Sequence, residues 1–239
     1  MRQQRAIVIS FSGIDGAGKS TQIAELLAYL EGLSLNSRIL TFWDDIVALS
    51  RIREKASRGV FKGDPGVGSP TNPICRRDKN ISCWYVTLIR CVFYALDALS
   101  LRIRLYRERS RAEVLVFDRY IYDELANLPL RRKLMRFYTR ALLKMASSPD
   151  VAFVLDADPE AAAIRKPEYP LEFVRRNRDA YLEIARMAGM TVVPGGCVEE
   201  MSQKIREVIC KVCEQSSVNS SNSLLHQASA PSSAKVPNT

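Results

Sequence analysis

The chain has 239 residues, 47% of them hydrophobic and 26% charged, which is enough to bury one sizeable α/β core. Its net charge of +9 suits polyanionic ligands such as nucleotides. Basic and aromatic residues do not alternate as a single-strand nucleic-acid platform requires, so nucleic acid binding is disfavoured. Residues 1–9 contain no apolar stretch long enough for a signal peptide, which argues against secretion.

The first predicted element is a buried strand over residues 6–11, an apolar run with β-branched side chains. The segment from Gly13 to Ser20 then fits the phosphate-binding pattern G-x-x-x-x-G-K-[ST]. Apolar residues at helical spacing predict a helix over residues 21–30, with Gly32 as its stop. Because a phosphate-binding loop must leave a strand and open a helix, both flanks favour this interpretation over an ordinary glycine-rich turn.

Each residue type in this loop has a physical role. Glycines let the backbone N–H groups turn inward around a phosphate, and the following helix adds its positive end. Lys19 can reach the β- and γ-phosphates of a nucleotide, and the Ser20 hydroxyl can hold Mg²⁺. The candidate cofactor-binding residues are Gly13, Asp15, Gly16, Ala17, Gly18, Lys19, Ser20 and Thr21.

A second strand is predicted over residues 38–43, and it ends in Asp44 and Asp45. A short basic helix is predicted over residues 46–58. Residues 59–80 are rich in glycine and proline and are too long for an ordinary connection, so we expect this stretch to be functional or mobile.

A long helix is predicted over residues 81–111, and its first half is almost uniformly apolar. Arg90 and Asp97 interrupt the apolar run, so a buried core helix is favoured over a membrane span. A charge on a buried helix needs a partner, and for Arg90 that partner is either an acidic side chain or a ligand phosphate.

The next predicted strand, residues 113–118, ends in Asp118 and suits the second Mg²⁺ contact of an enzyme with a phosphate-binding loop. Arg119 is beside it, and a guanidinium binds phosphate bidentately. A surface ion pair is the alternative role for Arg119. Three polar clusters therefore follow predicted strand ends: Gly13 to Ser20, Asp44-Asp45 and Asp118-Arg119-Tyr120.

The rest of the chain continues to alternate helices and strands. The predicted elements are helix 130–147, strand 151–156, helix 159–164 with Asp158 as its N-cap, helix 171–187, strand 191–194 and helix 199–213. Residues 215–239 are dominated by Ser, Asn and Pro, so we expect one domain over residues 1–214 and a disordered tail. Alternating strands and helices predict the three-layer α/β fold of P-loop NTPases, with a parallel sheet that binds ligands at the carboxyl ends of its strands.

Six cysteines are scattered through mostly apolar segments, which favours reduced thiols in a cytoplasmic protein. They are Cys75, Cys83, Cys91, Cys197, Cys210 and Cys213. The pair Cys210 and Cys213 forms a lone C-x-x-C at the end of a predicted helix, with no second pair or nearby histidine for zinc. Structural cysteines are therefore favoured over a metal or redox site.

Several segments together resemble thymidylate kinases and thymidylate kinase-like proteins, P-loop kinases of nucleoside monophosphates. The segments that carry the resemblance are 11–21, the triplet Asp118-Arg119-Tyr120, 149–160 and 173–185. The resemblance covers residues 6 to about 210 in order.

The resemblance implies transfer of the γ-phosphoryl group of ATP to a nucleoside monophosphate, with Mg²⁺ as the metal. Asp15 would lie near the acceptor sugar, and Arg90, Arg119 and Tyr120 would belong to the acceptor site. Arg165 matches the first arginine of the family's lid. The implied catalytic residues are Lys19, Asp118, Arg119 and Arg165, and the implied metal contacts are Ser20 and Asp118. The implied substrate contacts are Asp15, Arg90, Arg119 and Tyr120, and Asp44 and Asp45 are candidate substrate contacts from their position after a strand end.

The chain departs from the family pattern on the acceptor side. Where the family usually has an Arg-Glu-Pro-Gly-like segment, this chain has Trp43-Asp-Asp-Ile46, which removes an arginine and adds two carboxylates. Asp123 stands where a serine usually follows the triplet, and the lid is short and holds two prolines. The resemblance makes dTMP the leading acceptor. The altered residues leave the identity of the acceptor open.

Two alternatives stay open. A kinase of a non-nucleotide hydroxyl acceptor would use Asp44 or Asp45 as its base, because a hydroxyl must lose a proton whereas a phosphate acceptor is already ionised. A nucleotide-binding protein that does not catalyse would present its basic helices to a partner. A switch GTPase is disfavoured because no Asn-Lys-x-Asp signature is found. We expect a small-molecule nucleotide as ligand and no membrane partner, and the sequence leaves a homodimer open.

Overall fold

The computed structural model describes residues 6–43 and 84–228, and within these ranges the side chains of residues 84–86 and 215–228 are not described. The predicted helix at 46–58, the glycine- and proline-rich stretch at 59–80, and four candidate side chains all lie outside the described residues. Those four are Asp44, Asp45, Cys75 and Cys83.

The described part of the chain forms a five-stranded parallel sheet in the order β2-β3-β1-β4-β5. The strands are β1 (Ile7–Ser12), β2 (Ser37–Thr41), β3 (Val114–Asp118), β4 (Val151–Asp156) and β5 (Thr191–Pro194). The central strands β1 and β3 are almost wholly buried, as expected for a parallel sheet that is covered on both faces.

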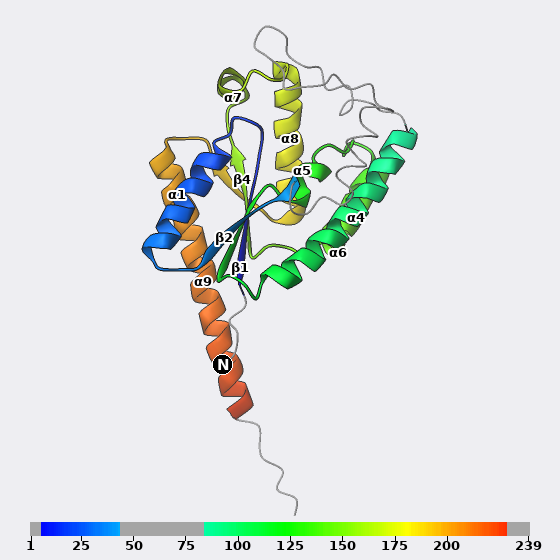
Figure 1. Cartoon of the computed structure of the whole chain (residues 1–239). Coiled ribbons are helices and arrows are strands. Elements are labelled where there is room, and N and C mark those ends of the chain that lie inside the picture. Colours follow the sequence, from blue (N-terminus) through cyan, green and yellow to red (C-terminus); the bar gives the residue numbers. More distant parts are fainter. Residues whose placement is uncertain (1–5, 44–83, 229–239) are drawn as a thin grey trace, which may run out of the picture.

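Helices cover both faces of this sheet, which confirms the predicted three-layer α/β architecture (Figure 1). The helices are α1 (Lys19–Gly32), α4 (Trp84–Glu108), α5 (Ile121–Leu125), α6 (Lys133–Met145), α7 (Pro159–Arg165), α8 (Leu171–Ala188) and α9 (Val198–Ala228). Figure 1 shows α1 and α9 together on one side of the sheet, with α4, α5, α6 and α8 grouped on the other side.

Strand register brings the loop after β1 and the residues after β3 to the same edge of the sheet. Asp118 lies beside Phe11 of β1 and beside Thr41 of β2 in the parallel ladder. The carboxyl ends of three neighbouring strands therefore meet there, as the sequence predicted.

Helix α4 is less buried than the sequence suggested. One of its faces packs into the core through Tyr94, Ala98, Leu101 and Leu105. The opposite face is also apolar but exposed, and its exposed residues are Leu88, Ile89, Val92, Leu96, Leu99, Ile103 and Tyr106. The prediction of a buried core helix therefore holds for one face of α4 only, because apolar composition does not reveal whether the second face of a helix meets the core or the surface. None of the described helices is both long and apolar enough to cross a membrane.

Helix α9 continues to Ala228, whereas the sequence predicted an end at residue 213 and a disordered tail from residue 215. Residues 198–228 contain no glycine and no proline, so nothing in this stretch interrupts a helix once it has started. In the structure residues 215–228 continue α9, and residues 229–239 lie outside the described part.

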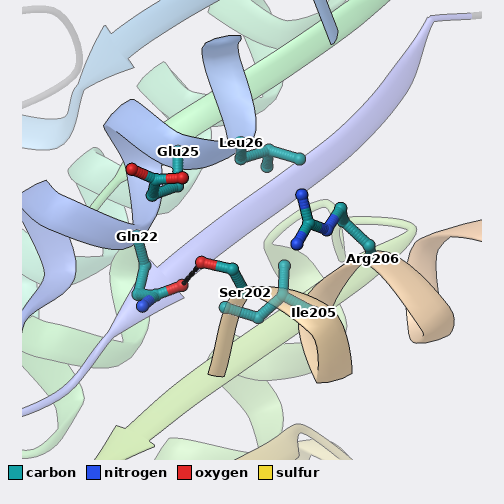
Figure 2. A pocket seen from close by; sticks show the side chains of 6 residues that line it. All are labelled: Gln22, Glu25, Leu26, Ser202, Ile205 and Arg206. Atoms are coloured by element: carbon teal, nitrogen blue, oxygen red, sulfur yellow. Dashed lines mark hydrogen bonds between the residues drawn. The ribbon is translucent and has the colours of Figure 1, made fainter. Parts of the chain in front are cut away.

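Polar side chains join α9 to α1. The Gln22 amide donates to the Val198 carbonyl at 3.1 Å, and the Ser202 hydroxyl donates to the Gln22 side-chain oxygen at 2.8 Å. Figure 2 shows this pair at the edge of a small hollow with about 170 Å³ of empty volume. The hollow is lined by Gln22, Glu25, Leu26, Ser202, Ile205 and Arg206, and none of these is a residue that the sequence predicted to bind a ligand.

Four cysteines fall within the described residues, and all four are free thiols, as predicted. They are Cys91, Cys197, Cys210 and Cys213.

Candidate functional site

The loop between β1 and α1 is held between β4 and α7. A Cβ atom added to Gly13 would lie 2.7 Å from the Leu155 carbonyl oxygen, and one added to Gly16 would lie 2.6 Å from the Ala162 carbonyl oxygen. Both glycines also have positive φ angles, 142° and 84°. Only glycine fits at these two positions, so the loop follows a path that a side chain would block.

The first turn of α1 is open to an anion. Gly18, in the left-handed conformation, is the N-cap, and no side chain caps the free N–H groups of the turn. The first turn also contains no acidic residue that would compete with a phosphate. Free N–H groups and the helix dipole together suit this end of α1 to binding a phosphate.

Lys19 is buried, with 7% of its surface exposed, and it is already directed at the loop. Its ammonium donates to the Gly13 carbonyl at 2.8 Å and to the Ile14 carbonyl at 2.9 Å, and lies 3.9 Å from a carboxylate oxygen of Asp15. Burial, and next the charge of Arg119, lower the pKa of Lys19 to about 8. An incoming phosphate would add negative charge beside this cation and so favour its charged form.

Ser20 and Asp118 provide oxygen atoms that suit Mg²⁺. The Ser20 side chain is exposed in the first turn of α1. The half-buried Asp118 carboxylate makes no hydrogen bond or ion pair with the described residues. Its negative charge opposes, without reversing, the lowering of the pKa of Lys19. A free carboxylate and a hydroxyl are hard ligands of the kind that Mg²⁺ accepts in small number. Among the described residues no cluster of three or more His, Cys, Asp or Glu side chains is placed to hold a metal.

Arg119 lies between two carboxylates. One terminal nitrogen of its guanidinium donates to Asp15, and the other lies 3.5 Å from a carboxylate oxygen of Asp123. Burial by itself lowers the pKa of Arg119, but Asp123 and then Asp15 outweigh it, so the net shift is upward. The pairing agrees with the ion-pair alternative, but both acidic partners belong to this same edge of the sheet rather than to the outer surface.

Asp123 is the site residue whose importance the sequence did not indicate. It lies in α5 and is 3% exposed. Its carboxylate accepts hydrogen bonds from the Ser12 hydroxyl at 2.7 Å, the Tyr181 hydroxyl at 2.8 Å and the Tyr120 backbone N–H at 3.0 Å. In the sequence, the feature that could have indicated a buried acid is the pair Asp123 and Glu124 between the apolar residues of Ile121-Tyr-Asp-Glu-Leu125.

Tyr120 does not reach the site with its side chain. The ring is completely buried, and its hydroxyl donates to the Ser147 carbonyl oxygen. The prediction that Tyr120 contacts a substrate was wrong for the side chain, because the apolar ring packs edge-on against Phe117 in the core. Its backbone N–H contributes indirectly, since it helps to hold Asp123.

The two remaining predicted arginines lie on helices beside the site. Arg90 is half-buried on α4, which packs against α5, and it has no ion pair with the described residues. Arg165 is exposed at the end of α7, the helix whose Ala162 carbonyl touches the loop. The structure thus leaves both guanidinium groups able to meet a ligand.

Ion pairs hold α7 to α8. Arg175 of α8 pairs with Glu160 of α7, and Arg178 of α8 donates to Asp156 at the end of β4, with one contact of 2.8 Å. The exposed Arg175–Glu160 pair thus joins α8 to the helix that carries Arg165, and the Arg178–Asp156 pair joins α8 to β4.

No family model matches the chain. The chain is, however, similar over most of its length to curated thymidylate kinases from bacteria and archaea. It is 27% identical over 189 residues to a thymidylate kinase of Bifidobacterium longum subsp. infantis, which covers 75% of this chain and 74% of that protein. It is 26% identical over 224 residues to the thymidylate kinase of Symbiobacterium thermophilum, with 87% and 94% covered. A probable thymidylate kinase of Archaeoglobus fulgidus is 25% identical over 210 residues, with 85% and 94% covered.

Replacing Lys19 with Met should stabilise the free protein and abolish nucleotide binding. Lowering the pKa from 10.5 to about 8 corresponds to about 3 kcal/mol of destabilisation, present when Lys19 is charged. Part of that gain is lost because the variant no longer donates to the two loop carbonyls, so we expect a net gain of about 1–2 kcal/mol at pH 7. Thermal unfolding and nucleotide titration of both proteins measure these effects.

The gain from Lys19→Met should depend on pH. Between pH 8 and 10.5 the unfolded chain holds a proton that the folded Lys19 has lost, so wild-type stability rises with pH and the advantage of the variant shrinks. The exposed Lys204 provides the control, because Lys204→Met should show neither effect. A Lys19→Met protein that is less stable at pH 7, or that binds ATP normally, would contradict this role of Lys19.

Proposed function

From the place of this chain among thymidylate kinase-like P-loop proteins, we propose that it transfers the γ-phosphoryl group of ATP to a nucleoside monophosphate, with dTMP as the leading acceptor. The products would be ADP and a nucleoside diphosphate. The relatives support the reaction class, and the arrangement of charges at the sheet edge supports the distribution of roles.

The observation that carries the proposal is the bridge between two cations at Asp15. A single carboxylate oxygen of Asp15 bonds to Arg119 and lies 3.9 Å from the Lys19 ammonium. Lys19 belongs to the donor loop, whereas Arg119 follows the neighbouring strand. Two cations from separate elements are therefore close enough for one to hold the donor phosphates and the other the acceptor phosphate of a single transfer.

Phosphoryl transfer requires positioning and positive charge rather than a covalent intermediate. In our proposal the loop N–H groups and Lys19 hold the donor phosphates, and Arg119 and Arg90 orient the acceptor phosphate. Mg²⁺ held by Ser20 and Asp118 would neutralise charge that develops on the phosphate oxygens. An acceptor phosphate is already ionised, so no side chain has to remove a proton from it. Arg165 would approach the donor from α7.

Asp44 and Asp45 remain predicted acceptor contacts outside the described residues. As carboxylates they would favour a hydroxyl of the acceptor over its phosphate. The acceptor must therefore be identified directly by experiment.

We expect labelled ATP to transfer phosphate to at least one nucleoside monophosphate in a panel that includes dTMP and dUMP, in the presence of Mg²⁺. Asp118→Asn should reduce the rate by at least about a hundredfold, because it removes a charged metal ligand. Asp179→Asn, the same change at an exposed position of α8, should leave the rate unchanged.

Other outcomes of this panel would identify the alternatives. Transfer only to non-nucleotide alcohols, lost in Asp44→Ala or Asp45→Ala, would favour a hydroxyl kinase. Tight ATP binding without transfer to any acceptor would favour a nucleotide-binding protein that does not catalyse. Either result would contradict the proposed reaction.

We also propose that the chain forms a homodimer through the exposed face of α4. The exposed residues Ile89, Val92, Leu96, Leu99, Ile103 and Tyr106 are spaced alternately by three and four residues, the pattern of a helix that packs along another helix. In a parallel pairing of two α4 helices, the exposed Arg102 and Arg107 of one copy would lie beside the same residues of the other copy and repel them. An antiparallel two-fold pairing keeps these like charges apart and is therefore favoured.

Replacing Val92 and Leu99 with Asp should therefore convert a dimer into a monomer, because each dimer would bury four unpaired carboxylates. Light scattering during size-exclusion chromatography measures the mass. Ile164→Asp, a change at an exposed apolar residue of α7 that is 81% exposed, is the matched control and should leave the dimer intact. A wild-type mass of one chain at tens of micromolar would refute the dimer.

A further inference from the structure

Asp123 differs from the other carboxylates of the site in being fixed on all sides. Its three hydrogen-bond donors come from three separate elements: Ser12 from β1, the Tyr120 backbone from the start of α5, and Tyr181 from α8. The Asp15 side chain, by comparison, is 24% exposed and lies in the loop between β1 and α1. A ligand can displace Asp15 from Arg119, but it cannot displace Asp123 without opening the core.

A buried carboxylate requires a nearby positive charge, since desolvation of an unpaired charge is strongly unfavourable. The nearest cation is Arg119, whose guanidinium nitrogen is 3.5 Å away. That separation is longer than a hydrogen bond, so the attraction is electrostatic and leaves the N–H groups of this nitrogen available. Burial, and next the charge of Asp123, raise the pKa of Tyr181, so its phenol remains a neutral donor.

The backbone of Arg119 also requires support. Its φ angle is 69°, in the left-handed region that residues other than glycine adopt at a cost of about 1–2 kcal/mol. Its N–H donates to the Phe11 carbonyl at 3.0 Å, which holds the residue against the end of β1. This backbone turn directs the side chain back toward Asp15 and Asp123 rather than along the strand.

We propose that Asp123 is a positioning residue that fixes the guanidinium of Arg119 for the acceptor phosphate. Asp15 holds the same guanidinium only while the site is empty, and the acceptor phosphate takes its place. Asp123 remains behind Arg119 throughout as the permanent counter-charge, and Ser12 and Tyr181 hold its carboxylate in place. This inference rests on the proposed function, because it assigns Arg119 to the acceptor.

The matched test replaces Asp123 with Asn, which keeps the shape but removes the charge. We expect the acceptor KM to rise about tenfold and the ATP KM to change much less, because Asp123 lies 3.5 Å from Arg119, whereas only its longer-range field reaches Lys19. Asp150→Asn is the control: its carboxylate accepts from the Val8 backbone at the opposite end of β1, so both KM values should stay as in the wild type. A fall in the acceptor KM, or an equal rise in both KM values, would overturn the proposal.

A double-mutant cycle separates positioning from a merely structural role. If Asp123 acts through Arg119, Asp123→Asn should change acceptor kinetics little in an Arg119→Lys background. Additive effects of the two changes would contradict the inference. Tyr181→Phe removes one of the three donors to Asp123 and should show a smaller rise in the acceptor KM.

One measurement needs no acceptor and therefore distinguishes failure of this inference from failure of the proposed function. The Arg119 Nε–H signal in ¹⁵N NMR spectra of the free protein can be assigned by its loss in Arg119→Lys. We expect a sharp, slowly exchanging signal in the wild type and a broadened one in Asp123→Asn. An identical signal in both proteins would refute the positioning role, whatever the acceptor panel shows.

Discussion

The parallel pairing of β1 with β3 is the constraint on which the candidate site depends. The register places Asp118 beside Phe11, so the residues after both strands emerge at one point. The phosphate-binding loop follows β1, and the metal-binding candidate and Arg119 follow β3. A shift of one residue in this register would turn every side chain of a strand to the opposite face. The buried apolar side chains of both strands prevent such a shift.

Charge balance is the second level of organisation. The buried Lys19 and the partly buried Arg119 lie among three carboxylates, those of Asp15, Asp118 and Asp123. In the free protein Lys19 bonds to loop carbonyls and Arg119 bonds to Asp15, so both cations already point toward the site. Such preorganisation lowers the free-energy cost of binding a phosphate, because the two side chains need not be ordered when the phosphate binds.

The sequence predicted the sheet, the loop and most helix positions, because these follow from local patterns of apolar residues and glycine. It did not predict the role of Asp123, since three distant segments must meet before the donors Ser12 and Tyr181 surround it. The sequence analysis placed the Tyr120 side chain in the site, because the sequence around a tyrosine does not show whether its ring faces a ligand or the core. Asp123 is also where the chain departs from the serine of the family pattern that it otherwise resembles.

The central claim is that Lys19 and Arg119 act on two different phosphates at one edge of the sheet. The most direct measurement is a crystal structure with ADP, Mg²⁺ and dTMP. We expect Lys19 on the ADP phosphates, Asp118 at the metal, and Arg119 on the dTMP phosphate with Asp15 displaced and Asp123 unmoved. Arg119 still bonded to Asp15, with dTMP elsewhere or absent, would contradict the account.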